Sequence, residues 1–330
     1  MRILPLCGLR TALCSVAAVA LTVLSVVNPA FSQVPSSTWI HLSTAVKPSA
    51  RSSCSMAYDP VSQKTVLFGG YDGSRHLNDT WTFDGKNWKH ITTAVAPPAR
   101  AAASAAYDVT LKQVVLFGGF NGQYLNDTWM WNGATSTWTQ ATPAHQPVPE
   151  TLPMLFADPL TGRVDEFGGY DGRFYQMTTW RWRSGDWHKL APAHSPSARA
   201  AAVIGTDPVH KQTVLFGGLA DVNPVNTWTY DGRTWTEQSP STQPNQRLNT
   251  GTVYDPRFGG VVTFGGFAGT DVNDTWLWSG NNWSQLAPQQ SPPPRESMGM
   301  AFDALHQQSI VFGGKNGSTL LNDTWVLQTH

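Results

Sequence analysis

Short runs of alternating apolar and polar residues recur along the chain, and turn-forming residues separate them. In the stretch 52–93, "SSCSMAY" runs into an Asp-Pro turn and "KTVLFGG" is β-branched and aromatic. The segments "DTWTFDG" and "NWKHIT" then alternate between apolar and polar positions. A period of two residues, bounded by Gly, Pro and Asp, predicts strands rather than helices. This stretch therefore predicts four short strands.

The four-strand pattern repeats six times along the chain. A Gly-Gly pair closes the second strand of each repeat, and successive pairs are 48–50 residues apart. The pairs begin at Gly69, Gly118, Gly168, Gly217, Gly265 and Gly313. One Trp follows every pair, and a second Trp follows seven to nine residues later in the first five repeats. Four strands at this period are typical of a propeller blade.

Repeats of the type "VLFGG…NDTW…DG…W…PPAR" resemble kelch repeats, and the resemblance covers residues 38–330. It implies an all-β fold, namely a six-bladed kelch-type β-propeller. It does not imply an activity, because one scaffold carries many kinds of site. The shared tryptophans are expected to fill the wedges between blades, since each buries a large apolar surface.

The two ends of the chain complement each other. The last repeat ends at "NDTWVLQTH" after three strands, whereas "TWIHLS" near the N-terminus resembles a fourth strand. We therefore expect residues 38–43 to complete the blade formed by about 295–330, within one propeller domain spanning 33–330. An open ring would leave strand edges unpaired.

Residues 1–32 have the features of a secretory signal peptide. Arg2 and Arg10 come early, an uncharged apolar run follows from Leu13 to Val27, and Ala30 and Ser32 supply small residues. The apolar run is short for a membrane span, although an uncleaved anchor is the alternative. The interpretation is a secreted or periplasmic protein that does not insert into a membrane after cleavage.

Composition narrows the classes of function. The chain has 22 basic and 22 acidic residues, so it lacks the basic footprint that nucleic acid requires. Cys54 is the only cysteine after residue 32, which excludes an intramolecular disulfide, and it is interpreted as a small core residue. No spacing of His or Cys predicts a metal site. No metal and no cofactor are therefore expected, and a monomer is expected.

An arginine precedes the first strand of five repeats, and an acid replaces it in the third. These residues are Arg51, Arg100, Glu150, Arg199, Arg247 and Arg295. One hypothesis is a ring of ligand-binding groups suited to a carboxylate or phosphate. The other hypothesis is that the arginines form ion pairs that stabilise the scaffold, with Asp79, Asp127, Asp274 and Asp323 as partners. The third repeat has Thr178 at the aspartate position, and this joint loss favours the pairing.

The third repeat departs furthest from the others. Asp165 and Glu166 stand where the other repeats have mostly apolar residues. A buried carboxylate without a partner is costly or retains its proton, so these acids are candidates for function or for local ion pairing.

Further candidate ligand contacts come from the connectors that are long and varied. Such loops on a rigid scaffold often carry binding residues. The candidates are His76, Tyr170, Asp171 and Arg173.

These features favour a binding module for a protein or carbohydrate partner that docks on the face built by the longer connectors. Two enzyme classes remain as alternatives. One is an enzyme similar to the six-bladed sialic acid mutarotases, which would use arginines and Glu150. The other is a copper oxidase similar to galactose oxidase, for which Cys54 is the only thioether donor available. No catalytic motif favours either, so the interpretation leans away from an enzyme.

Overall fold

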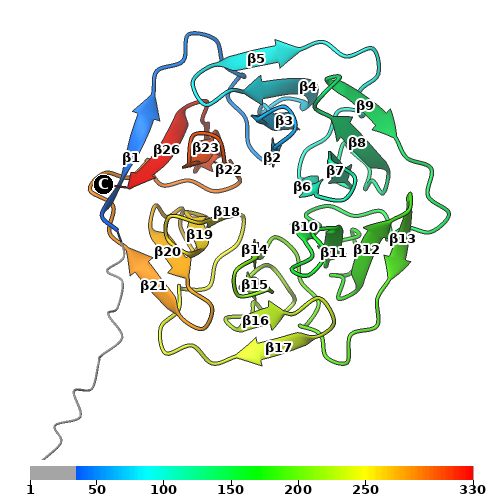
Figure 1. Cartoon of the computed structure of the whole chain (residues 1–330), viewed down its shortest axis with the longest axis vertical. Helices are drawn as coiled ribbons and strands as arrows, with labels where there is room; N and C mark the ends of the chain where they lie inside the picture. Colours follow the sequence, from blue (N-terminus) through cyan, green and yellow to red (C-terminus); the bar gives the residue numbers. More distant parts are fainter. Residues whose placement is uncertain (1–34, 330) are drawn as a thin grey trace, which may run out of the picture. The chain divides into compact units, whose positions relative to one another are not determined.

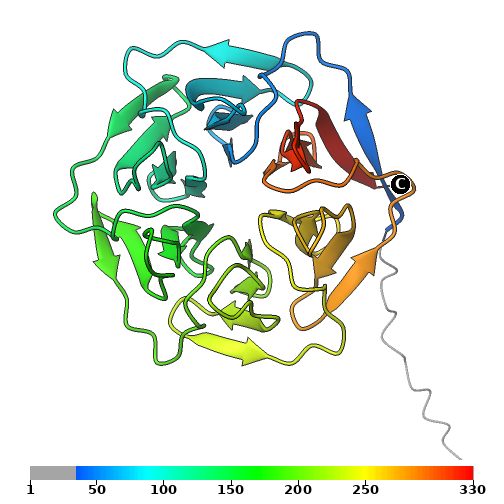
Figure 2. The same cartoon turned by 180° about the vertical axis from the view of Figure 1, so that it is seen from behind.

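The computed structural model describes residues 35–329, which form six four-stranded antiparallel sheets arranged around a central axis (Figures 1 and 2). No helix occurs among these residues. The expected all-β, six-bladed propeller is therefore confirmed. The predicted signal peptide at residues 1–32 lies outside the described residues.

Each of the first five blades is a meander in which consecutive strands pair. Blade one contains β2 (Ser55–Asp59), β3 (Lys64–Tyr71), β4 (His76–Phe83) and β5 (Trp88–Ile91). Blade two contains β6 (Ser104–Asp108), β7 (Gln113–Phe117), β8 (Thr128–Asn132) and β9 (Thr137–Gln140). Blade three contains β10 (Met154–Ala157), β11 (Val164–Phe167), β12 (Thr179–Arg183) and β13 (Asp186–Lys189).

The second half of the ring follows the same plan. Blade four contains β14 (Val203–Asp207), β15 (Gln212–Phe216), β16 (Thr227–Tyr230) and β17 (Trp235–Gln238). Blade five contains β18 (Gly251–Asp255), β19 (Gly260–Phe264), β20 (Thr275–Trp278) and β21 (Trp283–Leu286). Blade six contains β22 (Gly299–Asp303), β23 (Gln308–Phe312), β26 (Thr324–Thr329) and β1 (Ser37–Leu42). A small hairpin, β24 (Lys315–Asn316) and β25 (Thr319–Leu320), lies in the connector of blade six.

Blade six combines strands from both ends of the described chain. Its outermost strand, β1, pairs antiparallel with β26, from Ser37 opposite Thr329 to Leu42 opposite Thr324. Trp39 on this strand is fully buried, and its ring lies 5.0 Å from that of Phe264 in blade five. The strand therefore supplies both an edge to blade six and packing against its neighbour.

Tryptophans on the outermost strands link neighbouring blades. Each indole Nε1 donates to a threonine hydroxyl of the preceding blade, at 2.8–3.2 Å. The pairs are Trp39–Thr275, Trp88–Thr324, Trp138–Thr80, Trp187–Thr128, Trp235–Thr179 and Trp283–Thr227. The expectation that tryptophans fill the space between blades is confirmed for this set, and Trp39 occupies the sixth place.

A second cycle of hydrogen bonds encircles the axis just before the innermost strands. We call these six residues the belt: Ser53, Ala102, Leu152, Ala201, Asn249 and Ser297. Each backbone N–H donates to the carbonyl of the belt residue in the preceding blade, at 2.7–3.5 Å, and Ser53 closes the cycle by donating to Ser297. All six have a φ of 53–56°, a left-handed conformation that disfavours residues other than glycine. The strain is of order 1 kcal/mol for each residue and persists because the cycle holds it in place.

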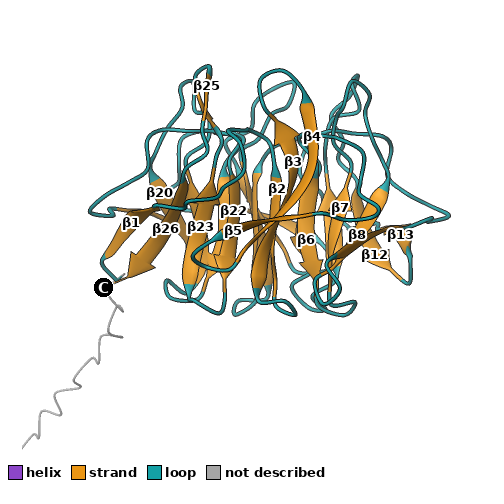
Figure 3. Cartoon of the chain, turned by 90° about the horizontal axis from the view of Figure 1, so that it is seen from above, coloured by secondary structure: helices purple, strands orange, loops and turns teal. Residues whose placement is uncertain are grey.

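The two faces of the ring differ in their connectors (Figure 3). Tight turns join the first strand to the second and the third to the fourth, and they share one face, the short-turn face. The longer connectors, including the β24–β25 hairpin, share the other, which we call the long-loop face (Figure 3). Any site on this face is built from the segments that precede the first strand and those that join the second strand to the third.

Candidate functional site

Five arginines precede the first strand of a blade, and we call them the rim arginines. Four of them are held by internal partners. In blade two, Arg100 is 1% exposed and its guanidinium donates to both carboxylate oxygens of Asp127, at 2.6 and 2.7 Å. It also donates to the Gly118 carbonyl at 3.0 Å, and the Trp129 indole donates to the same aspartate at 2.7 Å. Equivalent groups form around the pairs Arg51–Asp79, Arg247–Asp274 and Arg295–Asp323. These guanidinium groups stabilise the scaffold and are not directed at the central channel.

Removing one such aspartate is expected to destabilise the domain. Burial alone would raise the pKa of Asp127, but the hydrogen bonds and charge of Arg100 outweigh it and lower that pKa. Asp127→Ala leaves a buried cation without its partner, so we expect a loss of about 3–5 kcal/mol in the free energy of unfolding. Urea denaturation measures this. The control is Arg75→Ala, which breaks the exposed pair with Asp72 and is expected to change stability by no more than about 1 kcal/mol. Equal effects of the two variants would contradict the scaffold role.

Blade four keeps the arginine but not the carboxylate. Arg199 is fully buried, and its Nη1 donates to the side-chain oxygen of Asn226 at 3.2 Å. Asn226 in turn donates to Glu237 at 2.8 Å. Burial lowers the pKa of Arg199 to about 10, and the Glu237 charge opposes that shift. Sequence reasoning missed this substitution, although the printed repeat shows Asn226 at the aspartate position.

Blade three has an acid in the arginine position. Glu150 is 1% exposed, and its Oε1 has no hydrogen-bond partner among the described residues. Glu166 on β11 is fully buried, and neither of its carboxyl oxygens has a partner in the described part of the chain. Burial raises the pKa of both groups well above the ordinary value. The charge of Asp171 raises that of Glu150 further, and the charges of Glu150 and Asp165 raise that of Glu166. Both groups therefore retain a proton to a higher pH than an exposed glutamate does.

Asp165, the other unusual acid, has a cationic partner. Arg181 on β12 donates to both of its carboxyl oxygens, at 2.8 and 2.7 Å, and also donates to Asp158 at the start of the first turn. Burial raises the pKa of Asp165 to about 7, because it outweighs the opposing effect of Arg181. Of the two interpretations of this residue, local ion pairing fits the geometry. Glu166 is the acid that remains unexplained by pairing.

A row of aromatic rings crosses three blades on the long-loop face. It runs from Tyr71 and His76 in blade one, through Phe120 and Tyr124 in blade two, to Tyr170 and Tyr175 in blade three. Successive ring centroids are separated by 5.4, 5.8, 5.1, 6.1 and 4.9 Å. All six side chains are partly exposed. Sequence reasoning selected only His76 and Tyr170, although the aromatic residue directly after Gly-Gly in four repeats was an available signal.

Two hollows adjoin this row. The channel mouth is a hollow of about 690 Å³ lined by Tyr71, His76 and Phe120, and also by Ser297 and Lys315 of blade six. The second hollow, of about 720 Å³, includes Tyr124, Phe174, Asp171 and Arg173. The structure thus places His76, Tyr170, Asp171 and Arg173 along one surface, and it places the rim arginines and Glu150 beneath the surface.

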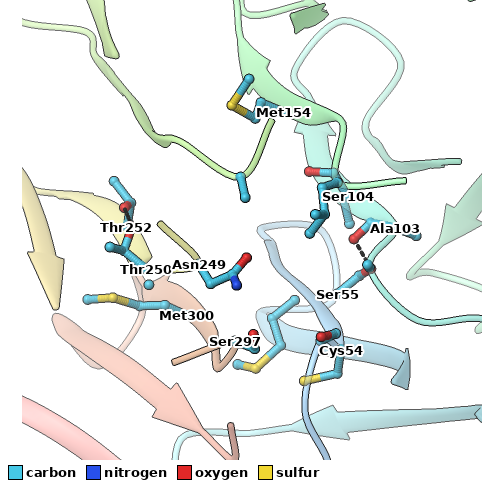
Figure 4. A pocket seen from close by; sticks show the side chains of 18 of the residues that line it. Cys54, Ser55, Ala103, Ser104, Met154, Asn249, Thr250, Thr252, Ser297 and Met300 are labelled. Atoms are coloured by element: carbon cyan, nitrogen blue, oxygen red, sulfur yellow. Dashed lines mark hydrogen bonds between the residues drawn. The ribbon is translucent and has the colours of Figure 1, made fainter. Parts of the chain in front are cut away.

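Below the belt, the channel continues into an axial chamber of about 210 Å³ (Figure 4). The innermost strands line it with small and hydroxyl residues, and Ser55 donates to the Ala103 carbonyl at 2.8 Å. Cys54 also lines the chamber, and burial raises the pKa of its thiol to about 11. Five of the belt residues border both the chamber and the channel mouth: Ser53, Ala102, Leu152, Asn249 and Ser297.

Within residues 35–329, no group of three or more His, Cys, Asp or Glu side chains is arranged to hold a metal ion. In the same range no helix is long and apolar enough to cross a membrane.

Comparison with known proteins agrees with the fold. Six four-stranded blades around one axis define the class as a β-propeller. A family model for the KLHDC2/KLHL20/DRC7 Kelch-repeats domain matches residues 24–154. No curated protein matches the chain. With its six Gly-Gly and Trp repeats, the chain is a kelch-repeat propeller, and domains of this kind generally mediate protein interactions.

Proposed function

We propose that this propeller is a binding module that takes a protein partner on its long-loop face, over the channel mouth. The observation that supports the proposal is the continuous aromatic row from Tyr71 to Tyr175. Aromatic side chains supply much of the binding energy at protein interfaces, because they bury a large area with little loss of conformational entropy. A row shared by three rigid blades offers such a surface already assembled.

The surroundings of the row support the same proposal. Phe174 is 57% exposed and Met177 is 55% exposed, and both belong to the blade-three connector beside Tyr170 and Tyr175. Polar groups such as Asp171 and Arg173 flank them. An apolar centre with a polar rim is the usual organisation of a protein interface.

Site-specific photo-crosslinking in the native host tests this proposal. A crosslinking amino acid at Tyr124 reports on the long-loop face, and one at Leu305, which is 51% exposed in a first turn, reports on the short-turn face. We expect a discrete protein adduct from position 124 only, and we expect Phe120→Ala to reduce its yield at least tenfold without changing the melting temperature by more than a few degrees. Adducts of equal yield from both positions would contradict the proposal.

A carbohydrate partner is the alternative for the same surface, because sugar rings also stack on aromatic faces. A glycan array screened with the purified protein distinguishes the two. Saturable binding of a glycan that Phe120→Ala abolishes, together with no protein adduct at position 124, would replace the protein partner with a carbohydrate.

We further propose that the protein is exported, on the basis of the charged start, apolar run and small residues in 1–32. Mass spectrometry of the protein from the culture medium or periplasm is expected to find an N-terminus at Gln33. Recovery of the uncleaved chain from the cytoplasm would contradict export.

A further inference from the structure

Sulfur-bearing side chains gather in the axial chamber. Cys54, Met56, Met154, Met298 and Met300 all line it, and each is at most 8% exposed. The described chain contains six methionines and one cysteine. Most of its soft donor atoms therefore lie around one small chamber on the axis. In Figure 4, Met154 lies across the chamber from Cys54 and Met300.

Cys54 and Met56 belong to the same seam between blades one and six. The sulfur atoms of both lie against Gly299 of β22, and the Cys54 Sγ is 3.2 Å from the position that a β-carbon on this glycine would take. Because both sulfurs lie close to the same point, the β-carbon position of Gly299, they also lie close to each other. A long side chain at position 56 fills the space left by Gly299, but this packing does not require sulfur at both positions.

The other sulfurs are arranged differently. Met300 faces the next seam, where its Sδ lies 2.9 Å from the β-carbon position of Gly251. The Sδ of Met154 accepts a hydrogen bond from the Ala202 amide at 3.2 Å. Cys54 is the only cysteine of the described chain, and Met56 is the methionine whose sulfur adjoins the same glycine.

This donor set selects for a particular class of ion. Thiolate and thioether sulfurs are soft ligands that favour Cu(I) and chemically similar ions, whereas Ca²⁺ and Mg²⁺ prefer several oxygens. A monovalent cation bound to one thiolate also forms a neutral unit, which suits a buried position better than a net charge would.

We propose that Cys54 Sγ and Met56 Sδ form a two-sulfur site for a soft monovalent cation, Cu(I) or Ag(I), that enters from the channel mouth. On binding, the metal–sulfur bond replaces the S–H bond, and the thiol proton passes to the solvent. The raised pKa of Cys54 means that the metal must displace this proton, so affinity rises with pH. The proposal revises the interpretation of Cys54 as a core residue alone.

The test is a titration of the purified full chain with Ag(I) alone, and with Cu(I) by competition against a chromophoric chelator. Cys7→Ser and Cys14→Ser are introduced so that Cys54 is the only thiol. We expect one ion per chain, release of about one proton per ion near neutral pH, and a rise in melting temperature with the ion. Met56→Leu is expected to weaken binding at least tenfold, and Cys54→Ser at least a hundredfold.

Met154→Leu is the matched control, because it removes a thioether from the far side of the same chamber and is expected to leave affinity unchanged. Exchanges between Met and Leu cost less than about 1.5 kcal/mol in most cores, so both variants should fold, and the melting temperature of each metal-free protein checks this. X-ray absorption of the loaded protein is expected to show two sulfur neighbours, one of which is lost in Met56→Leu. Unchanged affinity in Met56→Leu, or retained binding in Cys54→Ser, would overturn the proposal.

Discussion

Deleting residues 38–43 is expected to lower the melting temperature of the entire propeller by about 10 °C or more. The deletion removes most of β1, and with it the pairing with β26 and the buried Trp39 ring. Loss of a buried Trp side chain alone costs about 3–5 kcal/mol. The hydrogen bond from Trp39 to Thr275 and the packing against Phe264 also disappear, so blades five and six lose their connection at the outer edge.

Differential scanning calorimetry measures this effect, and two variants separate its causes. Replacing 38–43 with six Gly and Ser residues keeps the chain length and is expected to be nearly as harmful as the deletion. Trp39→Ala is expected to account for about 3–5 kcal/mol of the loss. An unchanged transition midpoint in the deletion variant would show that closure by β1 does not hold the ring together.

Glu166→Leu is expected to stabilise the protein at neutral pH by about 1–3 kcal/mol, which is the usual cost of a buried polar group without a hydrogen-bond partner. Leucine occupies the equivalent positions 67, 116 and 215, all of them fully buried. The substitution removes two carboxyl oxygens that have no partner among the described residues, and it restores the side chain that other blades use.

The pH dependence of this effect follows from the raised pKa values of Glu150 and Glu166. A raised pKa in the folded state means that folding retains a proton which the unfolded chain has released. The stability associated with that proton is fully present below the unfolded pKa of about 4.3 and is lost as pH rises toward the folded pKa. Asp165, with its pKa raised to about 7, contributes in the same direction between about pH 4 and 7.

Urea denaturation of Glu166→Leu and the parent at pH 4 and pH 8 tests this reasoning. The difference in stability between the two is expected to grow with pH. Only the parent has a Glu166 proton that the folded state retains and the unfolded chain releases. Aspartates with lowered pKa values, such as Asp127, act in the opposite direction, but they are common to both proteins and cancel. Glu166→Gln is the matched control that removes the titration while keeping the shape. A constant difference across this range would contradict a raised pKa of Glu166 in the folded state.

The sequence predicted the six-bladed ring because the same spacing of Gly-Gly pairs and tryptophans recurs in six repeats. It also predicted that the arginine and aspartate positions belong together, since blade three lost both. It did not predict the belt. Successive belt residues are about 50 positions apart, and the six positions hold four different residue types, so no single residue type marks their left-handed backbone.

The candidate surface was predicted only in part. Placement on the long-loop face follows from alternating connectors in a meander, and that face does carry His76, Tyr170, Asp171 and Arg173. The continuity of the aromatic row depends on the rotation between blades, which brings Phe120 against His76 and Tyr124 against Tyr170. For the rim arginines, the sequence favoured a scaffold role without excluding ligand binding, and their burial and their ion pairs with aspartates distinguish the two roles.

The belt also determines what the neck of the channel offers to anything that enters it. Its six amides all donate in one rotational sense, each to the blade before it. Every N–H and carbonyl in this circuit is engaged with a neighbour, and the components of their dipoles within the plane of the ring cancel around the circle. The neck is therefore unlike a selectivity filter lined by free carbonyls, since its backbone gives an ion or a peptide little to coordinate. Side chains alone can therefore select what binds along the axis. Substituting them can change the ligand preference of the neck while the backbone circuit stays intact.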